Sequence, residues 1–250
     1  MMSGHSKWAT IRRKKAANDA KRSNQFAKLL RAVEVAAKEG GGDVAANMTL
    51  ASAVEKARSS SVPADNIDRA IARGSGADAG GARYEEVMYE GYAPGGIALV
   101  VEALTDNRNR TAQEIRHAFT RASGTLGETG TTTWMFQRKG VVVVEKAVAP
   151  DEERVLEVAL EGGAEDVRDA ESSWEIVSAP QDFRAVQQSL EGAGISVLSA
   201  EISLLPTTSV PVEGGEARQV LQLIEALEDL DDVQSVYANF DIPEEVMASL

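Results

Sequence analysis

Residues 141–167 read VVVVEKAVAPDEERVLEVALEGGAEDV, and this stretch decides the fold class. Its four successive valines are typical of a buried strand, and a helical pattern and a second, shorter strand follow. The same alternation continues to residue 205. The pattern predicts a βαββαβ unit of ferredoxin-like type, with strands at 141–146, 165–170, 173–178 and 195–205 and helices at 151–162 and 181–193.

The sequence before this unit predicts a second, incomplete sheet. The segments YEEVMYEGY (84–92) and IALVVEAL (97–104) read as strands joined by APGG. A polar loop, Thr105–Thr111, precedes a helix that turns Ile115, Phe119 and Ala122 inward. The segments TTTWMFQR and VVVVEK flank Lys139-Gly140, which predicts a hairpin there.

The C-terminal tail supplies what the incomplete sheet lacks. It predicts a strand near 207–212, a helix from 216 to 229 and a strand near 233–240. The triplets at 159–161 and 226–228 are both Ala-Leu-Glu, and each precedes an acidic turn and a strand. We therefore expect two related α/β modules, the second inserted into the first. The predicted domains are 1–80, 81–130 plus 207–250, and 131–206.

The N-terminal part predicts a small helical domain. A helix begins at Asn24, has one apolar face and stops at Gly40-Gly41-Gly42; that face carries Phe26, Leu29, Leu30 and Val33. A second helix follows, with Leu50, Ala53, Val54 and Ala57 at the same spacing. A third has Asp65 as its expected N-cap and Gly74 at its end, and a Gly-rich linker covers 74–83. The fold class is thus α+β, with a helical domain and two α/β domains of which the middle one is discontinuous.

Composition excludes several classes of protein. The 250 residues include no cysteine and two histidines, so disulfides, thiolate metal sites and multi-histidine sites are excluded. No apolar run is long enough for a membrane helix, and no apolar segment follows the basic start as in a secretory signal. That start runs directly into a helical pattern, which favours mature structure over a transit peptide. We expect a cytoplasmic protein.

Charge is distributed unevenly along the chain. The net charge is −13, but residues 1–83 carry +7 and residues 146–250 carry −18. Residues 1–31 hold nine basic side chains and one acidic one, Asp19. A basic arm on an acidic body suggests a polyanionic partner. The acidic half reads as solvated helix faces and turns; contact with a basic protein or with the arm itself is the alternative.

The arm contains the main candidate binding residues. Its cations would neutralise phosphates, and Trp8 could stack on an unpaired base. A solvated basic helix is the alternative, and a membrane-surface helix lacks the bulky apolar face it needs. The nucleic-acid-binding candidates in this region are Lys7, Trp8, Arg12, Arg13, Lys14, Lys15, Lys21, Arg22, Lys28 and Arg31.

A second basic cluster, Asp106-Asn107-Arg108-Asn109-Arg110, enters the predicted helix. Arg108 and Arg110 are candidate phosphate contacts; the alternative is an Asn cap with an Arg110–Glu114 surface pair. The glycine-rich loops match no phosphate-binding motif, and no catalytic constellation can be assembled. We expect a protein that is not an enzyme, with no cofactor, no metal and no small-molecule substrate.

The chain resembles the YebC/PmpR family. The resemblance rests first on SGHSKW (3–8) and IRRKKAANDAKR (11–22), and continues in YEGYAPGG (89–96) and DNRNRT (106–111). It extends through Gly40–Gly42, Pro63–Gly74, Gly162–Val167 and Leu227–Tyr237. The sequence departs from the family pattern at NMTL (47–50) and over residues 125–132. The likeness therefore spans essentially the whole chain.

The resemblance implies a fold and a function. It implies one helical and two α/β domains, with the middle one discontinuous. It also implies a non-enzymatic regulator of gene expression: a DNA-binding transcriptional regulator or, as the alternative, a translation factor that acts at the ribosome on difficult, proline-rich sequences. The partner would be DNA or ribosomal RNA and tRNA, and the ribosome itself is a further candidate. The resemblance gives Arg108 and Arg110 added weight as contacts.

Overall fold

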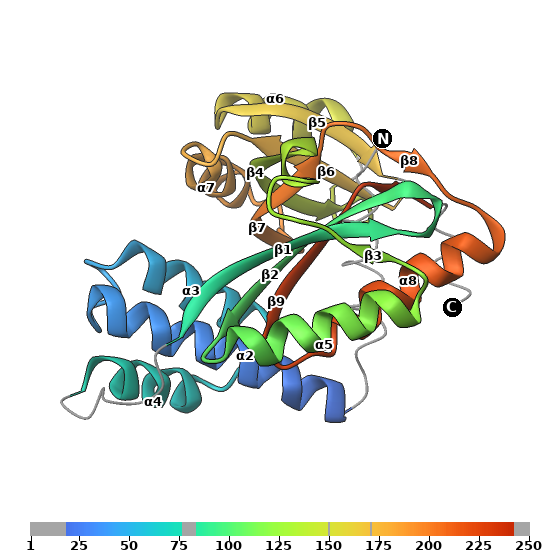
Figure 1. The fold of residues 1–250 in the computed structure, drawn as a ribbon. Helices are drawn as coiled ribbons and strands as arrows, with labels where there is room; N and C mark the ends of the chain where they lie inside the picture. The colour runs from blue at the N-terminus through green and yellow to red at the C-terminus, as the bar shows by residue number, and fades with distance from the viewer. Residues whose placement is uncertain (1–18, 77–83, 150, 171, 243–250) are drawn as a thin grey trace. The chain divides into compact units, whose positions relative to one another are not determined.

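The computed structural model describes residues 19–76, 84–149, 151–170 and 172–242 (Figure 1). Its described residues divide into two compact units. Unit 1 comprises 134–212 and 237–242, and unit 2 comprises 19–133 and 213–236. Unit 2 begins with an all-helical region, and both units contain antiparallel strands packed with helices. The α+β class with an N-terminal helical region is confirmed.

The helical region has a core of its own. It consists of α2 (Asp19–Gly40), α3 (Met48–Ser59) and α4 (Ala64–Ser75). The predicted apolar faces are confirmed, since the core draws all its members from residues 26–71; its buried residues are Leu29, Val33, Ala36, Ala37, Leu50, Val54, Ala57, Val62, Ile67 and Ala70. α2 ends at the predicted glycines, and Gly41 adopts φ 86° there.

Several predicted ends of these helices were wrong. α2 already includes Asp19, five residues before the expected start. In α4 the N-cap is Pro63, and Asp65 lies in the first turn, where its charge still favours the helix N-terminus. Gly74 is the penultimate residue of α4, one residue from the predicted end, and a Cβ there would stand 2.1 Å from the carbonyl oxygen of Glu34 on α2. Its role is close helix packing.

The sheet of unit 2 has the order β3-β1-β2-β9. Its strands are β1 (Glu85–Ala93), β2 (Ile97–Thr105), β3 (Thr125–Leu126) and β9 (Val233–Ala238). β1 and β2 form the predicted hairpin across the 3-10 turn η1 (Pro94–Gly96). Two helices, α5 (Arg108–Arg121) and α8 (Gly214–Glu228), lie side by side along this sheet (Figure 1). The predicted polar loop was too long, because Asn107 caps α5 and the helix begins at Arg108.

Unit 1 contains the predicted ferredoxin-like unit. After η2 (Thr133–Met135), the order is β4 (Phe136–Glu145), α6 (Glu152–Glu161), β5 (Ala164–Ala170), β6 (Ser173–Ser178), α7 (Phe183–Gly192) and β7 (Ser199–Pro206). The antiparallel sheet has the order β5-β6-β4-β7, and both helices pack on a core that includes Val142, Trp174 and Val186. A small parallel pair, β8 (Val210–Pro211) and β10 (Phe240–Asp241), completes the unit.

The predicted hairpin around Lys139-Gly140 was wrong. Both residues lie inside β4, which runs unbroken between β6 and β7. Gly140 is needed for packing and not for a turn, because a Cβ there would stand 2.5 Å from Ser178 Oγ and 2.8 Å from Phe183 Cβ. The three-domain division at residues 1–80, 81–130 plus 207–250, and 131–206 stays a prediction.

Candidate nucleic-acid interface

The structure places some of the twelve predicted contact residues and not others. Lys7, Trp8, Arg12, Arg13, Lys14 and Lys15 lie outside the described residues. Lys21 and Arg22 belong to α2, where only the backbone is described. Lys28 and Arg31 follow on the same helix, and Arg108 and Arg110 lie in the first turn of α5. The four described cations can therefore be examined by their contacts.

One polar row of α2 contacts the turn between α8 and β9. We call residues 228–232, Glu-Asp-Leu-Asp-Asp, the acidic turn. Asn24 Nδ2 donates to the carbonyl oxygen of Asp229 at 3.0 Å, and Lys28 Nζ donates to that of Glu228 at 2.5 Å. Carbonyls at the end of a helix lack intrahelical partners and carry partial negative charge, so cations are favourable there. The row of α2 thus caps the C-terminus of α8.

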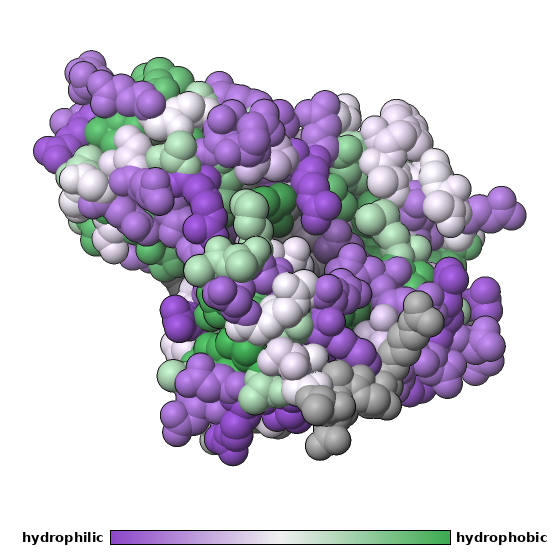
Figure 2. Space-filling model, turned by 90° about the vertical axis from the view of Figure 1, so that its left-hand side faces the viewer, coloured by the Kyte–Doolittle hydropathy of each residue, from purple (hydrophilic) through white to green (hydrophobic). Residues whose placement is uncertain are grey.

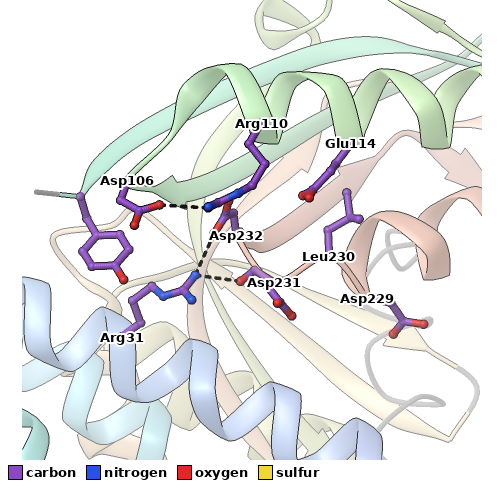
Figure 3. A pocket seen from close by; sticks show the side chains of 9 residues that line it. Arg31, Asp106, Arg110, Glu114, Asp229, Leu230, Asp231 and Asp232 are labelled. Atoms are coloured by element: carbon purple, nitrogen blue, oxygen red, sulfur yellow. Dashed lines mark hydrogen bonds and ion pairs between the residues drawn. The ribbon is translucent and has the colours of Figure 1, made fainter. Parts of the chain in front are cut away.

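Arg31 and Arg110 converge on one buried carboxylate, Asp232 (Figure 3). Arg31 donates to Asp232 Oδ1 at 3.0 Å, and Arg110 donates to Oδ2 at 2.6 Å. The hydroxyls of Thr105 and Thr111 also donate to Oδ2, at 3.2 and 2.7 Å. The side chain of Asp232 is 3% exposed. One residue of the acidic turn therefore joins α2, β2 and α5.

These contacts keep the Asp232 carboxylate in its charged form. Desolvation would raise the pKa of Asp232, but hydrogen bonds from Arg110, Thr111 and Thr105 outweigh it and lower that pKa below its ordinary value. The pKa of Arg110 is raised by its bonds to Asp232 and Asp106. Asp232 is therefore ionised at neutral pH. The alternative that paired Arg110 with Glu114 was wrong about the partner, because Arg110 pairs with Asp106 at 3.0 Å and with Asp232.

A cleft of about 470 Å³ lies beside this group. Arg31 forms part of its wall and stacks over the ring of Tyr84 at 5.2 Å. Five of its nine lining residues are carboxylates: Asp106, Glu114, Asp229, Asp231 and Asp232. A cleft with this excess of negative charge repels phosphate. The sequence does not indicate that Asp232 is the centre of a contact network, because its partners lie 121 to 201 residues away in the chain.

Arg108 differs from the other three described cations. Its side chain is 63% exposed, and its ion pair with Glu85 is long, at 3.7 Å. An exposed pair of this kind contributes little to stability, so Arg108 can exchange its partner for another anion. Tyr89 Oη donates to the carbonyl oxygen of Arg108 at 3.3 Å and helps to position the start of α5. Among the described candidates, Arg108 is the cation most open to a ligand.

A second buried carboxylate, Glu90 on β1, holds the loop before η2. Its Oε1 accepts from the amide of Gly130 at 2.7 Å, and its Oε2 accepts from the amides of Thr132 and Thr133 at 2.6 and 2.8 Å. Desolvation raises the pKa of Glu90, but these hydrogen bonds lower it to about 2 overall. The group is saturated by the protein itself and has a structural role.

Other classes of site find little support in the described residues. Within 19–76, 84–149, 151–170 and 172–242, no group of three His, Asp or Glu side chains could hold a metal ion. In the same part of the chain, no helix combines the length and the apolar character that a bilayer crossing requires. On the face shown in Figure 2, hydrophilic residues cover most of the surface and interrupt the apolar areas. Such a surface suits charged or polar partners.

Comparisons with known proteins agree over nearly the whole chain. Residues 6–77 match the family described as the TACO1/YebC protein N-terminal domain, and residues 84–240 match the TACO1/YebC second and third domain. A protein of Salinispora arenicola, called "Probable transcriptional regulatory protein", is 55% identical over 249 residues that cover both chains completely. A protein of the same name from Rubrobacter xylanophilus is 56% identical and covers 100% of this chain and 99% of its own.

A solved structure shows the same likeness. The crystal structure of a conserved hypothetical protein from Aquifex aeolicus superposes with a TM-score of 0.81 at 44% sequence identity. The match covers 91% of this chain and 93% of that one. That protein is described only as a conserved hypothetical protein, so the likeness supports the fold and assigns no activity.

Proposed function

Because the chain belongs to the TACO1/YebC family, we propose that it is a nucleic-acid-binding regulator of gene expression without catalytic activity. The names of its relatives support regulation of transcription. The observation that carries the proposal is the separation of charge: nine basic residues and one acidic residue in 1–31, against −18 in 146–250. We place the protein in the cytoplasm.

The basic arm supplies the phosphate contacts in this proposal. Each cation that neutralises a phosphate releases condensed counterions, so affinity falls as salt rises. The negative charge of the C-terminal half confines contact to the arm and its surroundings, because a polyanion is repelled elsewhere. Exposed Arg108 adds a contact outside the arm.

A salt titration tests the proposal. Binding is measured by fluorescence anisotropy with a duplex of about 30 base pairs and with single-stranded RNA of equal length. If about six arm cations contact duplex phosphates, log K falls with log salt at a slope of about −5. Replacing Arg12, Arg13, Lys14 and Lys15 together by Gln should abolish binding while the melting temperature stays unchanged.

A matched variant controls for net charge. Lys56, Arg58, Arg116 and Arg121 are exposed cations on α3 and α5, and replacing all four by Gln changes the charge by the same amount. This control variant should bind nearly as well as the wild type. A slope near zero in the wild type, or equal losses in the two variants, would refute binding through the arm.

The second candidate is a translation factor that binds ribosomal RNA or tRNA. The strong negative charge of residues 146–250 favours it. An acidic body is a poor partner for coating a DNA duplex, whereas the basic N-terminal end alone can contact an RNA that is recognised by its shape. Sucrose-gradient fractionation of native lysate separates the two candidates. Arm-dependent comigration with ribosomes or their subunits indicates a translation factor. Migration only at the top of the gradient argues against stable ribosome binding, and promoter occupancy is then the next measurement.

A further inference from the structure

The contact between α2 and the acidic turn uses the same kind of side chain that the proposed function assigns to phosphate. Lys28 and Arg31 are the last two cations of the basic arm, and both lie on α2. In the structure they donate to oxygens of the turn: Lys28 to the carbonyl of Glu228, and Arg31 to the carbonyl of Asp231 and to Asp232 Oδ1. Carbonyl and carboxylate oxygens satisfy these cations as phosphate oxygens do. The turn therefore occupies two predicted phosphate contacts.

Arg31 can separate from Asp232 without leaving this buried carboxylate unpaired. Arg110, Thr105 and Thr111 all donate to Asp232 Oδ2, whereas Arg31 donates to Oδ1. Departure of Arg31 leaves the carboxylate with a charged partner and two hydroxyl donors. Removal of every partner from a buried charge is strongly destabilising because the charge is left uncompensated, whereas Asp232 keeps the compensation of Arg110 when Arg31 leaves. The contact with α2 is thus the separable part of the Asp232 group.

The attachment of α2 to the turn is polar and partly exposed. The core of the helical region is drawn from residues 26–71, so it does not depend on the acidic turn. The bonds of Asn24 and Arg31 to turn carbonyls are solvent-exposed, and the Arg31 side chain is 25% exposed. Exposed polar contacts weaken as the salt concentration rises, and another anion can readily replace the acidic turn as the partner of these side chains. The helical region can therefore stay folded when this attachment opens.

We propose that the acidic turn is an autoinhibitory contact, which holds Lys28 and Arg31 until a nucleic-acid backbone displaces it. The proposal rests on the proposed function, because it concerns the same cationic surface. In the closed state the other cations of the arm bind without Lys28 and Arg31. In the open state Lys28 and Arg31 add two phosphate contacts, so binding is tighter and the slope of log K against log salt is steeper by about 1.8 for duplex DNA.

A reversible cross-link tests this directly. Asn24 and Asp229 lie at the exposed rim of the contact, with Nδ2 of one 3.0 Å from the carbonyl oxygen of the other. The native chain has no cysteine, so the double variant Asn24→Cys/Asp229→Cys carries one possible disulfide. Oxidation closes the contact and reduction releases it in the same protein. Mass spectrometry confirms the bond, and anisotropy with the duplex and the RNA measures binding across a range of KCl.

The reduced form should bind at least fivefold more tightly than the oxidised form, with the steeper salt slope. The single variant Asn24→Cys under the same oxidant is the matched control and should not change. Equal affinities and slopes for both forms, in a protein whose arm is still required, would overturn the autoinhibition and leave the proposed function standing. Loss of binding in every form, the wild type included, would instead overturn the proposed function and this inference with it.

Discussion

Replacement of Glu90 by Gln should destabilise the protein in a way that depends on pH. Glu90 lies on β1, is 2% exposed and accepts the amides of Gly130, Thr132 and Thr133. A glutamine cannot accept all three, because its amide nitrogen is a donor and would face a backbone N–H. The variant therefore removes the charge and leaves at least one of the three donors unpaired.

The pKa values give the size of the effect. The pKa of Glu90 falls from 4.5 to about 2 on folding. At 1.36 kcal/mol per unit, this shift stabilises the folded state by about 3 kcal/mol at pH 7. Because the folded pKa is the lower one, the stabilisation is complete above about pH 4.5 and is lost as pH falls towards 2. At pH 3 about 2 kcal/mol of it has gone.

Urea unfolding followed by circular dichroism measures the free energy of unfolding at pH 7 and pH 3. With an m value of about 3 kcal/mol/M, the variant's midpoint should lie about 1 M lower than that of the wild type at pH 7. At pH 3 the gap should shrink to about a third. Glu86→Gln, an exposed change on the same strand, is the control and should shift neither midpoint. A gap of equal size at both pH values would refute the assignment of the low pKa to Glu90.

Two further substitutions test packing and capping by thermal unfolding. Asn47→Ala removes the N-cap of α3 and a buried bond from Nδ2 to the carbonyl of Ala36, so the melting temperature should fall by roughly 5 °C; an unchanged value would contradict the capping role. Gly140→Ala forces a methyl group against Phe183 and should lower it by roughly 4 °C. Its control, Gly192→Ala, meets nothing within 4 Å and should be neutral or slightly stabilising; equal losses at both glycines would refute the packing argument.

Patterns local in the chain predicted the elements well. The alternation over 141–205 correctly predicted the ferredoxin-like order, and the apolar spacing at Leu50, Val54 and Ala57 correctly predicted the buried face of α3. These features follow from residues that are neighbours along a helix or strand. Their periodicity reports directly on which face is buried.

Glycines caused the errors at element boundaries. Gly140 and Gly74 were each read as a stop signal, because glycine favours turns and helix ends. In the structure Gly140 lies in the middle of β4 and Gly74 in the last turn of α4, and at both positions another segment approaches too closely for a Cβ. Sequence alone does not distinguish these two uses, since the crowding partner, Phe183 or Glu34, is remote in the chain.

The Asp232 group shows a similar limit for the candidate site. The density of basic residues indicates Lys28 and Arg31, and the family resemblance favours Arg110, but neither indicates the carboxylate that Arg31 and Arg110 both contact. Asp232 looks like any other acidic residue of the C-terminal tail. The pattern predicts that the tail completes the sheet of unit 2, as β9 does beside β2, but it does not indicate which carboxylate of the preceding turn becomes buried there.

The pairing of β9 with β2 also bears on the order in which the chain folds during synthesis. The ferredoxin-like sheet uses one continuous segment, from Phe136 to Pro206, and can form once that segment has left the ribosome. The sheet of unit 2 needs Val233–Ala238, more than a hundred residues after its first strands, so its contact order is high and its closure late. Until then β2 presents an open edge, and a chain that terminates early at about residue 210 would expose that edge to aggregation.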